Sequence, residues 1–239
     1  MAQFEKSALV TGGAQRIGKS IVFALSAMGY DIALHYNHSR ERAEEIAEQI
    51  RLDGGRCELF QADLFRADEL SRVMENVFEK FPGLSLLVNN ASVFERSTLL
   101  ETEEELFERQ MNINFKAPLF LSRNFARVCR EGHIINILDA KIAHNKFNYF
   151  AYTLSKKALA EFTKMAALEL APRIRVNGIG PGPILPPPME NDDYLDKLVK
   201  NIPLQRRGNP ELITHSLRFL LENDYITGQV LYVDGGDHL

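Results

Sequence analysis

Three residues near the middle of the chain have side chains suited to acid–base chemistry: Asp139, Tyr152 and Lys156. Asp139 ends an apolar run that begins at Ile134 and is predicted to be a buried strand. Tyr152 and Lys156 stand four residues apart at the start of a predicted helix, so they project from one face of it. If the strand end meets the helix start, a carboxylate, a phenol and an amine converge. We expect this point to be the catalytic centre.

The phenol of Tyr152 needs a neighbour that makes it a useful proton donor. Its ordinary pKa lies near 10, and lowering that value by ~2–3 units requires roughly 3–4 kcal/mol of preference for the phenolate. An ammonium in a partly dry site supplies that order of magnitude. We therefore predict that Lys156 lowers the pKa of Tyr152. The alternative is an exposed Tyr–Lys pair on a helix surface, with no catalytic role.

Asp139 bears on the class of substrate. A carboxylate accepts hydrogen bonds and repels a carbonyl oxygen, and it donates only when it is protonated. No serine or threonine occurs between Gly132 and Tyr149 to donate in its place. We expect a substrate whose reacting atom is a ring nitrogen, which receives a proton while hydride goes to carbon. The alternative is an inactive protein with a surface aspartate.

The elements that must position these residues alternate short β-branched runs with helical periods. This pattern predicts an α/β fold: a Rossmann-type, doubly wound parallel sheet of about seven strands with helices on both faces. Strands are predicted at 8–11, 32–36, 57–61, 84–88, 134–139, 173–179 and 230–233. Helices are predicted from the glycine turn to about 28, and at 40–52, 68–81, 103–111, 115–129, 149–170, 194–201 and 211–221.

Composition points to one domain, 1–239, without repeats or a linker, and with a substrate loop at about 182–210. The net charge of −4 argues against a nucleic-acid or membrane surface, and no run approaches the ~18 apolar residues of a membrane span. The segment 1–6 is too short and polar for a signal peptide. Neither the two cysteines nor the histidines are spaced like metal ligands, so we expect no metal and a cytoplasmic protein.

The first predicted strand runs into a glycine-containing turn and then a helix. Such a turn can hold a pyrophosphate on free backbone N–H groups at the helix N-terminus. Gly12 and Gly18 bracket the turn, with Arg16 and Ile17 between them. The spacing differs from G-x-G-x-x-G, and a plain turn is the alternative.

The end of the second strand indicates which dinucleotide is preferred. An NAD site places Asp or Glu there to accept from the ribose 2′-hydroxyl, and residues 35–40 contain no acid. His38, Ser39 and Arg40 could hold a 2′-phosphate, which favours NADPH. The alternative is that Ser39 only caps the next helix. Asp63, followed by Leu64, is placed to face an adenine ring, or only starts the next turn.

In chain order, the motifs resemble those of the short-chain dehydrogenase/reductase family over nearly the whole chain. They are the glycine turn, Asn89-Asn90-Ala91, Asn114, Tyr152-x-x-x-Lys156, Pro181-Gly182 and Asp234-Gly235-Gly236. Finer features resemble the pteridine reductase branch: Arg16, His35-Tyr36, Asn90 to Phe94, Asp139 and Ala166 to Pro172. His38 departs from that branch, which often carries an arginine beside the 2′-phosphate.

The resemblance implies roles for several residues. Lys156 would hold the nicotinamide ribose, with Asn114 supporting it through a water, and Phe94 would sandwich a pterin against the nicotinamide. Most family members have a serine where Asp139 stands. The implied substrate contacts are Arg16, Phe94, Asp139 and Tyr152. The implied cofactor contacts are Gly12, Arg16, Ile17, Gly18, His35, Tyr36, Asn37, His38, Ser39, Arg40, Asp63, Leu64, Asn90, Ala91, Ser92, Lys156, Pro181 and Gly182.

These expectations combine into an NADPH-dependent reductase of a pterin or folate C=N bond, with hydride from the nicotinamide and a proton from Tyr152 acting with Asp139. A carbonyl reductase of 3-oxoacyl or sugar substrates is the alternative within the family, and a non-catalytic NADPH-binding sensor is the alternative outside enzymes. An ordinary core phenylalanine is the competing interpretation of Phe94. His144 is expected to be only a loop residue. The loop from Pro183 to Asn191 is expected to cover the substrate, and family members are commonly homotetramers.

Overall fold

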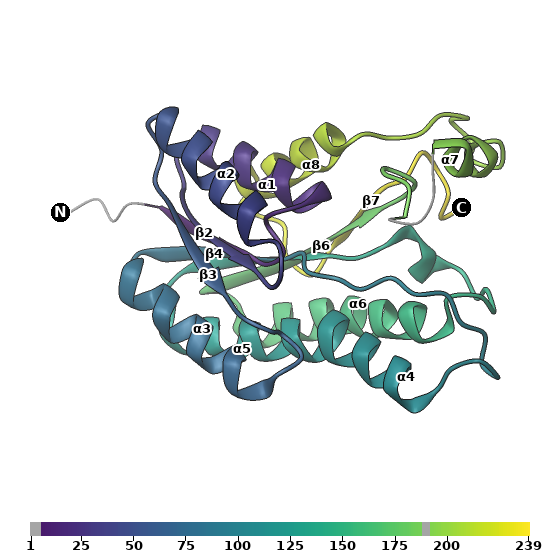
Figure 1. The fold of residues 1–239 in the computed structure, drawn as a ribbon, viewed down its shortest axis with the longest axis horizontal. Helices are drawn as coiled ribbons and strands as arrows, with labels where there is room; N and C mark the ends of the chain where they lie inside the picture. The colour runs from purple at the N-terminus through teal and green to yellow at the C-terminus, as the bar shows by residue number, and fades with distance from the viewer. Residues whose placement is uncertain (1–5, 188–191) are drawn as a thin grey trace.

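A computed structural model describes residues 6–187 and 192–239. Seven parallel strands form one sheet in the order β3-β2-β1-β4-β5-β6-β7 (Figure 1). They are β1 Ser7–Val10, β2 Asp31–Tyr36, β3 Cys57–Gln61, β4 Leu84–Asn89, β5 Gly132–Ile137, β6 Ile174–Pro181 and β7 Val230–Val233. The predicted doubly wound parallel sheet is therefore confirmed.

Helices cover both faces of the sheet. Figure 1 shows α1, α2 and α8 on one side and α3, α4, α5 and α6 on the other. The helices are α1 Arg16–Ala27, α2 Arg40–Leu52, α3 Ala67–Lys80, α4 Glu104–Met111, α5 Ala117–Val128, α6 Phe150–Leu170, α7 Asp192–Val199 and α8 Pro210–Glu222. A sheet buried on both faces explains the apolar run Ala8-Leu9-Val10 in β1, and all residues of this strand, including Ser7, are buried.

Two hydrophobic clusters hold the layers together. One packs Ile21 of α1, Ile46 of α2 and Leu217 of α8 against the sheet. The other packs Val73 of α3 and Phe125 of α5 against the opposite face. All five side chains are at most 4% exposed. Because the strands are clamped from both sides, the loops at their carboxyl ends have a rigid base.

The junction between α4 and α5 differs from the prediction. A break was expected near residues 112–114, but a π-helical turn, η1 Asn112–Lys116, joins the two helices without interruption. The physical reason lies in Asn114, whose buried amide donates to the Val93 carbonyl at 3.0 Å and accepts from the Val93 N–H at 2.9 Å. A side chain fixed to another segment favours a widened turn at this point.

Several boundaries bear on the site. β5 ends at Ile137, so Asp139 lies two residues beyond the strand and begins the short 3₁₀ turn η2 Ala140–Ala143, whose Lys141 N–H it accepts. β6 continues to Pro181. Residues 182–187 form no helix or strand, while 188–191, part of the predicted substrate loop, lie outside the described residues. No helix in the described ranges is long and apolar enough to cross a membrane.

Candidate active site

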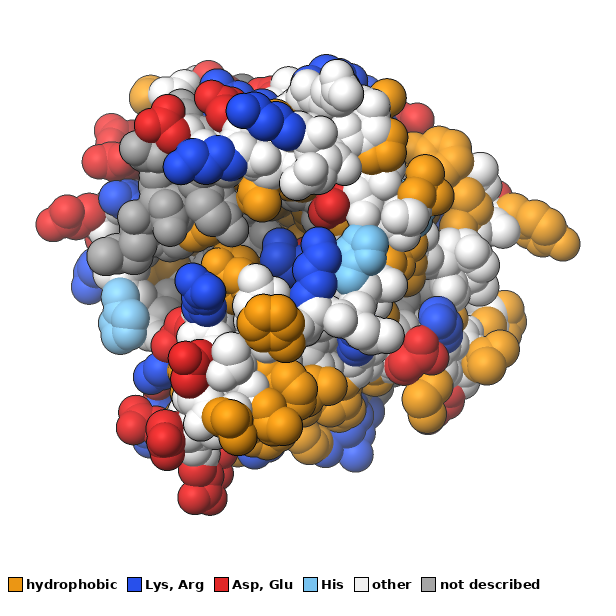
Figure 2. All heavy atoms as spheres, turned by 90° about the vertical axis from the view of Figure 1, so that its right-hand side faces the viewer, with side chains coloured by type: hydrophobic (Ala, Val, Ile, Leu, Met, Phe, Trp, Pro, Cys, Tyr) orange, Lys and Arg blue, Asp and Glu red, His pale blue; other side chains and the backbone are white. Residues whose placement is uncertain are grey.

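A cavity of about 640 Å³ opens at the carboxyl ends of the strands. The loops after β1 and β4 both line it, and these strands are neighbours where the strand order reverses. In doubly wound sheets this position is the usual place for a ligand. Figure 2 faces this end of the molecule and shows Lys and Arg side chains beside hydrophobic ones around a hollow.

Most of the predicted site residues line this cavity. They are Gly12, Arg16, Ile17, Gly18, His35, Tyr36, Asn37, His38, Ser39, Asp63, Leu64, Asn90, Ala91, Ser92, Phe94, Asp139, Tyr152, Lys156, Pro181 and Gly182. Two predicted residues, Arg40 and Asn114, are not part of its lining. Segments far apart in the sequence therefore meet at one surface.

The structure brings Asp139 and Tyr152 into direct contact. The Tyr152 hydroxyl donates to Asp139 Oδ2 at 2.7 Å, and the Lys141 N–H donates to Asp139 Oδ1 at 2.8 Å. Lys156 lies one helical turn beyond Tyr152, and its ammonium donates to the Ile137 carbonyl at 2.8 Å. Both the Tyr152 and Lys156 side chains are buried. A carboxylate, a phenol and an ammonium thus occupy one end of the cavity.

The expected effect of Lys156 on Tyr152 is wrong for this structure. Burial, and next the negative charge of Asp139, raise the pKa of Tyr152 well above 10. Burial also lowers the pKa of Lys156 to about 8, with Asp139 acting in the opposite direction. The ammonium is directed to the Ile137 carbonyl, so desolvation and the carboxylate decide the state of the phenol. Tyr152 is a neutral hydrogen-bond donor at pH 7.

Asn114 lies outside the cavity lining and contacts two segments that border the cavity. It accepts from Ser92 Oγ at 3.0 Å and donates to Ser155 Oγ at 3.1 Å. With its two bonds to Val93, this fully buried side chain connects the segment after β4 to α6. The contacts assign Asn114 a positioning role for that segment; its predicted support of Lys156 through a water remains a prediction.

The glycine turn fits a phosphate group. The first turn of α1 has no side-chain cap, so its N–H groups remain available to an anion. A Cβ on Gly18 would overlap the Gly12 carbonyl oxygen and lie 2.6 Å from Asn90 Nδ2. Only glycine therefore leaves the backbone of the turn accessible. Asn90 also donates to the Thr11 carbonyl at 2.9 Å, which fixes the turn against β4.

Arg16 adopts the left-handed backbone conformation, with φ at 53°. Its Nη2 donates to the carbonyl of Pro186 at 2.8 Å and lies 3.4 Å from the carbonyl of Leu185. The guanidinium thus bridges the glycine turn and the segment after β6. The predicted contacts of Arg16 with cofactor and substrate stay predictions, although the side chain lines the cavity.

The His35 ring accepts a hydrogen bond from the glycine turn. The Gly12 N–H donates to Nδ1 at 3.1 Å, so Nε2 carries the hydrogen and donates to the Ala62 carbonyl at 3.0 Å. Burial lowers the pKa of His35 to about 4, so the ring is neutral near pH 7. The residue therefore connects the turn to the end of β3.

The residues predicted for a 2′-phosphate divide into two groups. His38 and Ser39 line the cavity. Arg40 does not; its side chain is 71% exposed and pairs with Glu44 at 2.8 Å. Ser39 stands at the N-cap of α2 but makes no capping hydrogen bond, and its hydroxyl instead accepts from Gln15. The alternative that Ser39 merely caps α2 is therefore not supported by its contacts.

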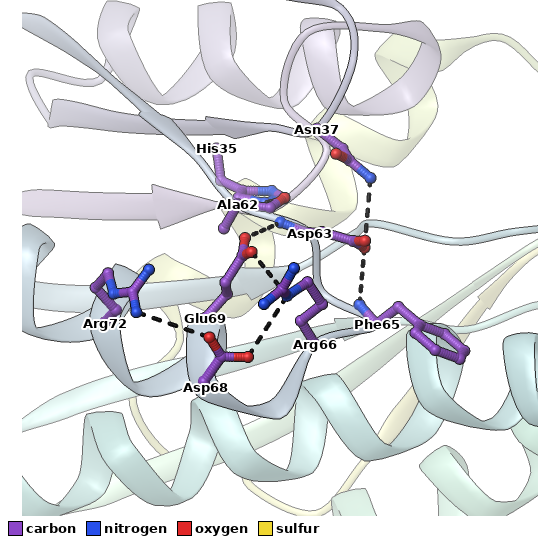
Figure 3. Close-up of polar contacts among 9 residues, drawn as sticks. All are labelled: His35, Asn37, Ala62, Asp63, Phe65, Arg66, Asp68, Glu69 and Arg72. Atoms are coloured by element: carbon purple, nitrogen blue, oxygen red, sulfur yellow. Dashed lines mark hydrogen bonds and ion pairs between the residues drawn. The ribbon is translucent and has the colours of Figure 1, made fainter.

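Asp63 is held in a polar network at the opposite end of the cavity (Figure 3). Its Oδ1 accepts from the Phe65 N–H at 3.0 Å and from Asn37 Nδ2 at 3.5 Å. Its own N–H donates to Glu69 Oε2 at 2.6 Å, and Arg66 lies 3.1 Å from Glu69 Oε1. The carboxylate therefore accepts from the turn that it starts, and Asp63 also lines the cavity; its contact with an adenine ring stays a prediction.

An aromatic wall completes the site. Phe94 stacks on Tyr149 with ring centroids 4.4 Å apart and meets Tyr152 edge to face at 4.7 Å. Phe94 is part of the cavity lining, so the competing view of it as an ordinary core residue is wrong. The Lys141 ammonium lies 5.5 Å from the Phe94 centroid. Sequence reasoning missed Lys141 and Tyr149.

Other cavity residues were also missed. They are Ala14, Gln15, Val93, Glu95, Ile113, Ile137 and Leu138. Six further lining residues belong to the substrate loop predicted at about 182–210: Pro183, Ile184, Leu185, Pro187, Leu195 and Leu198. Most are apolar and carry no chemical signal in the sequence. Lys141 did carry a signal, because it is a charged residue two positions after Asp139. His144 lies outside this lining, and its Nε2 is 2.5 Å from the Asp237 carbonyl. The described residues contain no cluster of three or more metal ligands.

The chain is similar to known proteins along nearly its whole length. A family model described as enoyl-(acyl carrier protein) reductase matches residues 12–238. The 3-oxoacyl-[acyl-carrier-protein] reductase FabG of Staphylococcus epidermidis is 33% identical over 243 residues, covering 98% of this chain and 99% of that protein.

Solved structures show the same similarity. FolM alternative dihydrofolate reductase 1 from Brucella suis, in complex with NADP, is 36% identical with a TM-score of 0.93, covering 97% of this chain and 94% of that chain. A blue fluorescent protein from a metagenomic library, in complex with NADPH, is 33% identical with a TM-score of 0.91 and covers 97% of both chains.

Proposed function

Because the chain belongs to the short-chain dehydrogenase/reductase family, whose members use a nicotinamide cofactor, we propose that it is an NADPH-dependent reductase of a pterin or folate C=N bond. The single observation that carries the proposal is the contact between Tyr152 and Asp139. A carboxylate at this position repels a carbonyl oxygen but suits a heterocycle that presents N–H groups. The similarity to an alternative dihydrofolate reductase supports the same substrate class.

The residues of this chain fit a dinucleotide. The uncapped N-terminus of α1 and the glycine turn would hold its diphosphate, while His38 and Ser39 would face its 2′-phosphate. Neighbours crystallised with NADP or NADPH support this choice of cofactor. When bound, the cofactor supplies a hydride to the substrate carbon.

The chain's own residues supply the proton and the orientation. Neutral Tyr152 gives its hydroxyl proton to the substrate nitrogen as that atom gains the electron pair of the C=N bond. Lys156, protonated below about pH 8, balances the negative charge that remains on Tyr152 and Asp139. Phe94 provides an apolar face for a flat ring.

A carbonyl reductase is the second candidate, and the curated relatives favour it. The 33% identity to a 3-oxoacyl-[acyl-carrier-protein] reductase spans nearly the full length of both proteins. In that case the Tyr152 proton would pass to a carbonyl oxygen. Asp139 would then have to be protonated, or turned away, to avoid repelling that oxygen.

One experiment separates the candidates. The purified protein is incubated with NADPH and, separately, with dihydrobiopterin, dihydromonapterin, dihydrofolate, a 3-oxoacyl thioester and a keto sugar, and NADPH oxidation and products are followed. Turnover of a dihydropterin or dihydrofolate supports the proposal. Reduction of only the carbonyl compounds would overturn it. NADPH binding without any turnover would favour the non-catalytic sensor.

We also propose that the activity resides in a single domain, 1–239, with a substrate loop at about 182–210. The buried thiols of Cys57 and Cys129 suit the reducing cytoplasm. Exposed Leu154, Met165 and Leu168 on α6 suit a contact between subunits of a homotetramer, which light scattering on the purified protein would test.

A further inference from the structure

Lys141 contacts Asp139 in two ways. Its backbone N–H donates to Asp139 Oδ1 at 2.8 Å, and its ammonium lies 3.8 Å from the same oxygen. The two residues are brought together by η2, the 3₁₀ turn that Asp139 caps. The other carboxylate oxygen, Oδ2, accepts from Tyr152. Each oxygen of Asp139 therefore has its own partner.

The position of the Lys141 ammonium is set by an aromatic pair. It lies 5.5 Å from the ring centroid of Phe94 and 5.9 Å from that of Tyr149. The two rings are stacked, so the ammonium faces a continuous aromatic surface on one side and a carboxylate on the other. The Lys141 side chain is 31% exposed and that of Asp139 is 17% exposed, so solvent screens the pair only in part.

The other titratable groups around Asp139 do not duplicate this arrangement. Tyr152 and Lys156 face it from α6, and the Lys156 ammonium is directed to the Ile137 carbonyl. Arg16 and Glu95 line the same cavity, but they are bound to the Pro186 carbonyl and to Arg109. Within residues 6–187 and 192–239, Lys141 is the cation in an ion pair with Asp139.

We propose that Lys141 is a positioning residue that holds the Asp139 carboxylate in its contact with the Tyr152 hydroxyl. Its backbone N–H and its ammonium both face Oδ1, which leaves Oδ2 to accept from Tyr152. The inference rests on the proposed acid–base role of Tyr152 and Asp139 in pterin reduction.

The test compares Lys141→Met, which keeps the length of the side chain, with Lys141→Arg, which keeps the charge. Lys146→Met, at an exposed lysine on the same loop, is the matched control. The values of kcat and KM are measured with NADPH and whichever substrate the wild-type protein reduces. In Lys141→Met, kcat is expected to fall by up to about fivefold with an unchanged KM for NADPH, the size expected for a partly exposed ion pair. Lys141→Arg and Lys146→Met are expected to keep the wild-type kcat.

A second measurement needs no substrate. With ¹³C-labelled aspartate, the carboxyl signal of Asp139 is identified by its absence in Asp139→Asn. Its chemical shift should change in Lys141→Met and should stay as in wild type in Lys146→Met. An unchanged chemical shift in Lys141→Met, or a wild-type kcat, would overturn the inference. Failure of the pterin proposal is recognised separately, because the wild-type substrate screen decides it and the NMR measurement does not depend on it.

Discussion

The Tyr152 hydroxyl, in the first turn of α6, donates to Asp139 Oδ2 at 2.7 Å. Asp139 lies two residues after the end of β5. This contact makes the phenol a neutral donor rather than a phenolate, because burial and the adjacent negative charge both raise the pKa of Tyr152. At neutral pH the phenol therefore carries the proton that reduction of the substrate requires. The first two predictions follow from it.

Replacing Tyr152 with Phe should abolish proton delivery while leaving the ring in place. We expect kcat to fall by roughly 10²- to 10⁴-fold, the usual contribution of a positioned general acid. NADPH affinity, measured by fluorescence titration, should change little. A variant that retains near wild-type kcat would show that Tyr152 is not the proton donor.

Replacing Asp139 with Ser should discriminate between the two substrate classes. We expect kcat/KM for a dihydropterin to fall roughly 10- to 100-fold, the size of a lost hydrogen bond to a charged group. Reduction of a 3-oxoacyl substrate should be retained or should rise, because a serine hydroxyl donates to a carbonyl oxygen. Undiminished pterin reduction in this variant would contradict the role given to the carboxylate.

The state of Lys156 predicts the alkaline side of the pH profile. Its pKa is lowered to about 8, chiefly by burial, so the ammonium is charged below that pH and loses its charge as the pH rises through it. Since this charge balances the anion left on Tyr152, kcat should decline above about pH 8. A rate that stays level up to pH 10 would exclude this contribution of Lys156.

Replacing Gly18 with Ala should prevent phosphate binding. The added Cβ would overlap the Gly12 carbonyl oxygen, so the turn must deform. We expect NADPH affinity to fall at least tenfold, the loss caused by about 1.4 kcal/mol. Gly54→Ala is the control, because Gly54 also has a positive φ, at 84°, but has no neighbour within 4 Å of its Cβ position. That variant should lose stability without losing affinity for NADPH.

The exposed position of Arg40 predicts that it does not select the cofactor. Arg40→Ala removes a side chain that pairs with Glu44 outside the cavity lining, so the ratio of NADPH to NADH affinity should stay unchanged. His38→Asp should lower that ratio, because it places a negative charge in the lining. A large change of the ratio in Arg40→Ala would show that the guanidinium reaches the cofactor.

The sequence was sufficient to predict the sheet because buried parallel strands and amphipathic helices leave distinct periodic patterns. It also placed Asp139 and Tyr152 together, since motifs that follow β5 and open α6 must meet at one edge of such a sheet. It could not predict the raised pKa of Tyr152, because burial depends on how the whole cavity closes.

Other features required tertiary information. The π-helical turn η1 depends on Asn114 reaching Val93, a contact between segments twenty-one residues apart in sequence. The aromatic wall depends on Tyr149, whose ring stacks on Phe94 from a left-handed backbone conformation with φ at 57°. Neither contact has a periodic signature in the sequence.

The bridge made by Arg16 has a thermodynamic consequence. Among residues 6–187 and 192–239, the contacts of Arg16 with the carbonyls of Leu185 and Pro186 both use Nη2, and the N–H groups of Nε and Nη1 can donate to other acceptors. A phosphate bound to those groups would immobilise the same guanidinium that holds residues 185–186. Ligand binding at the glycine turn and ordering of that segment would then favour each other by equal free energies, as linkage requires.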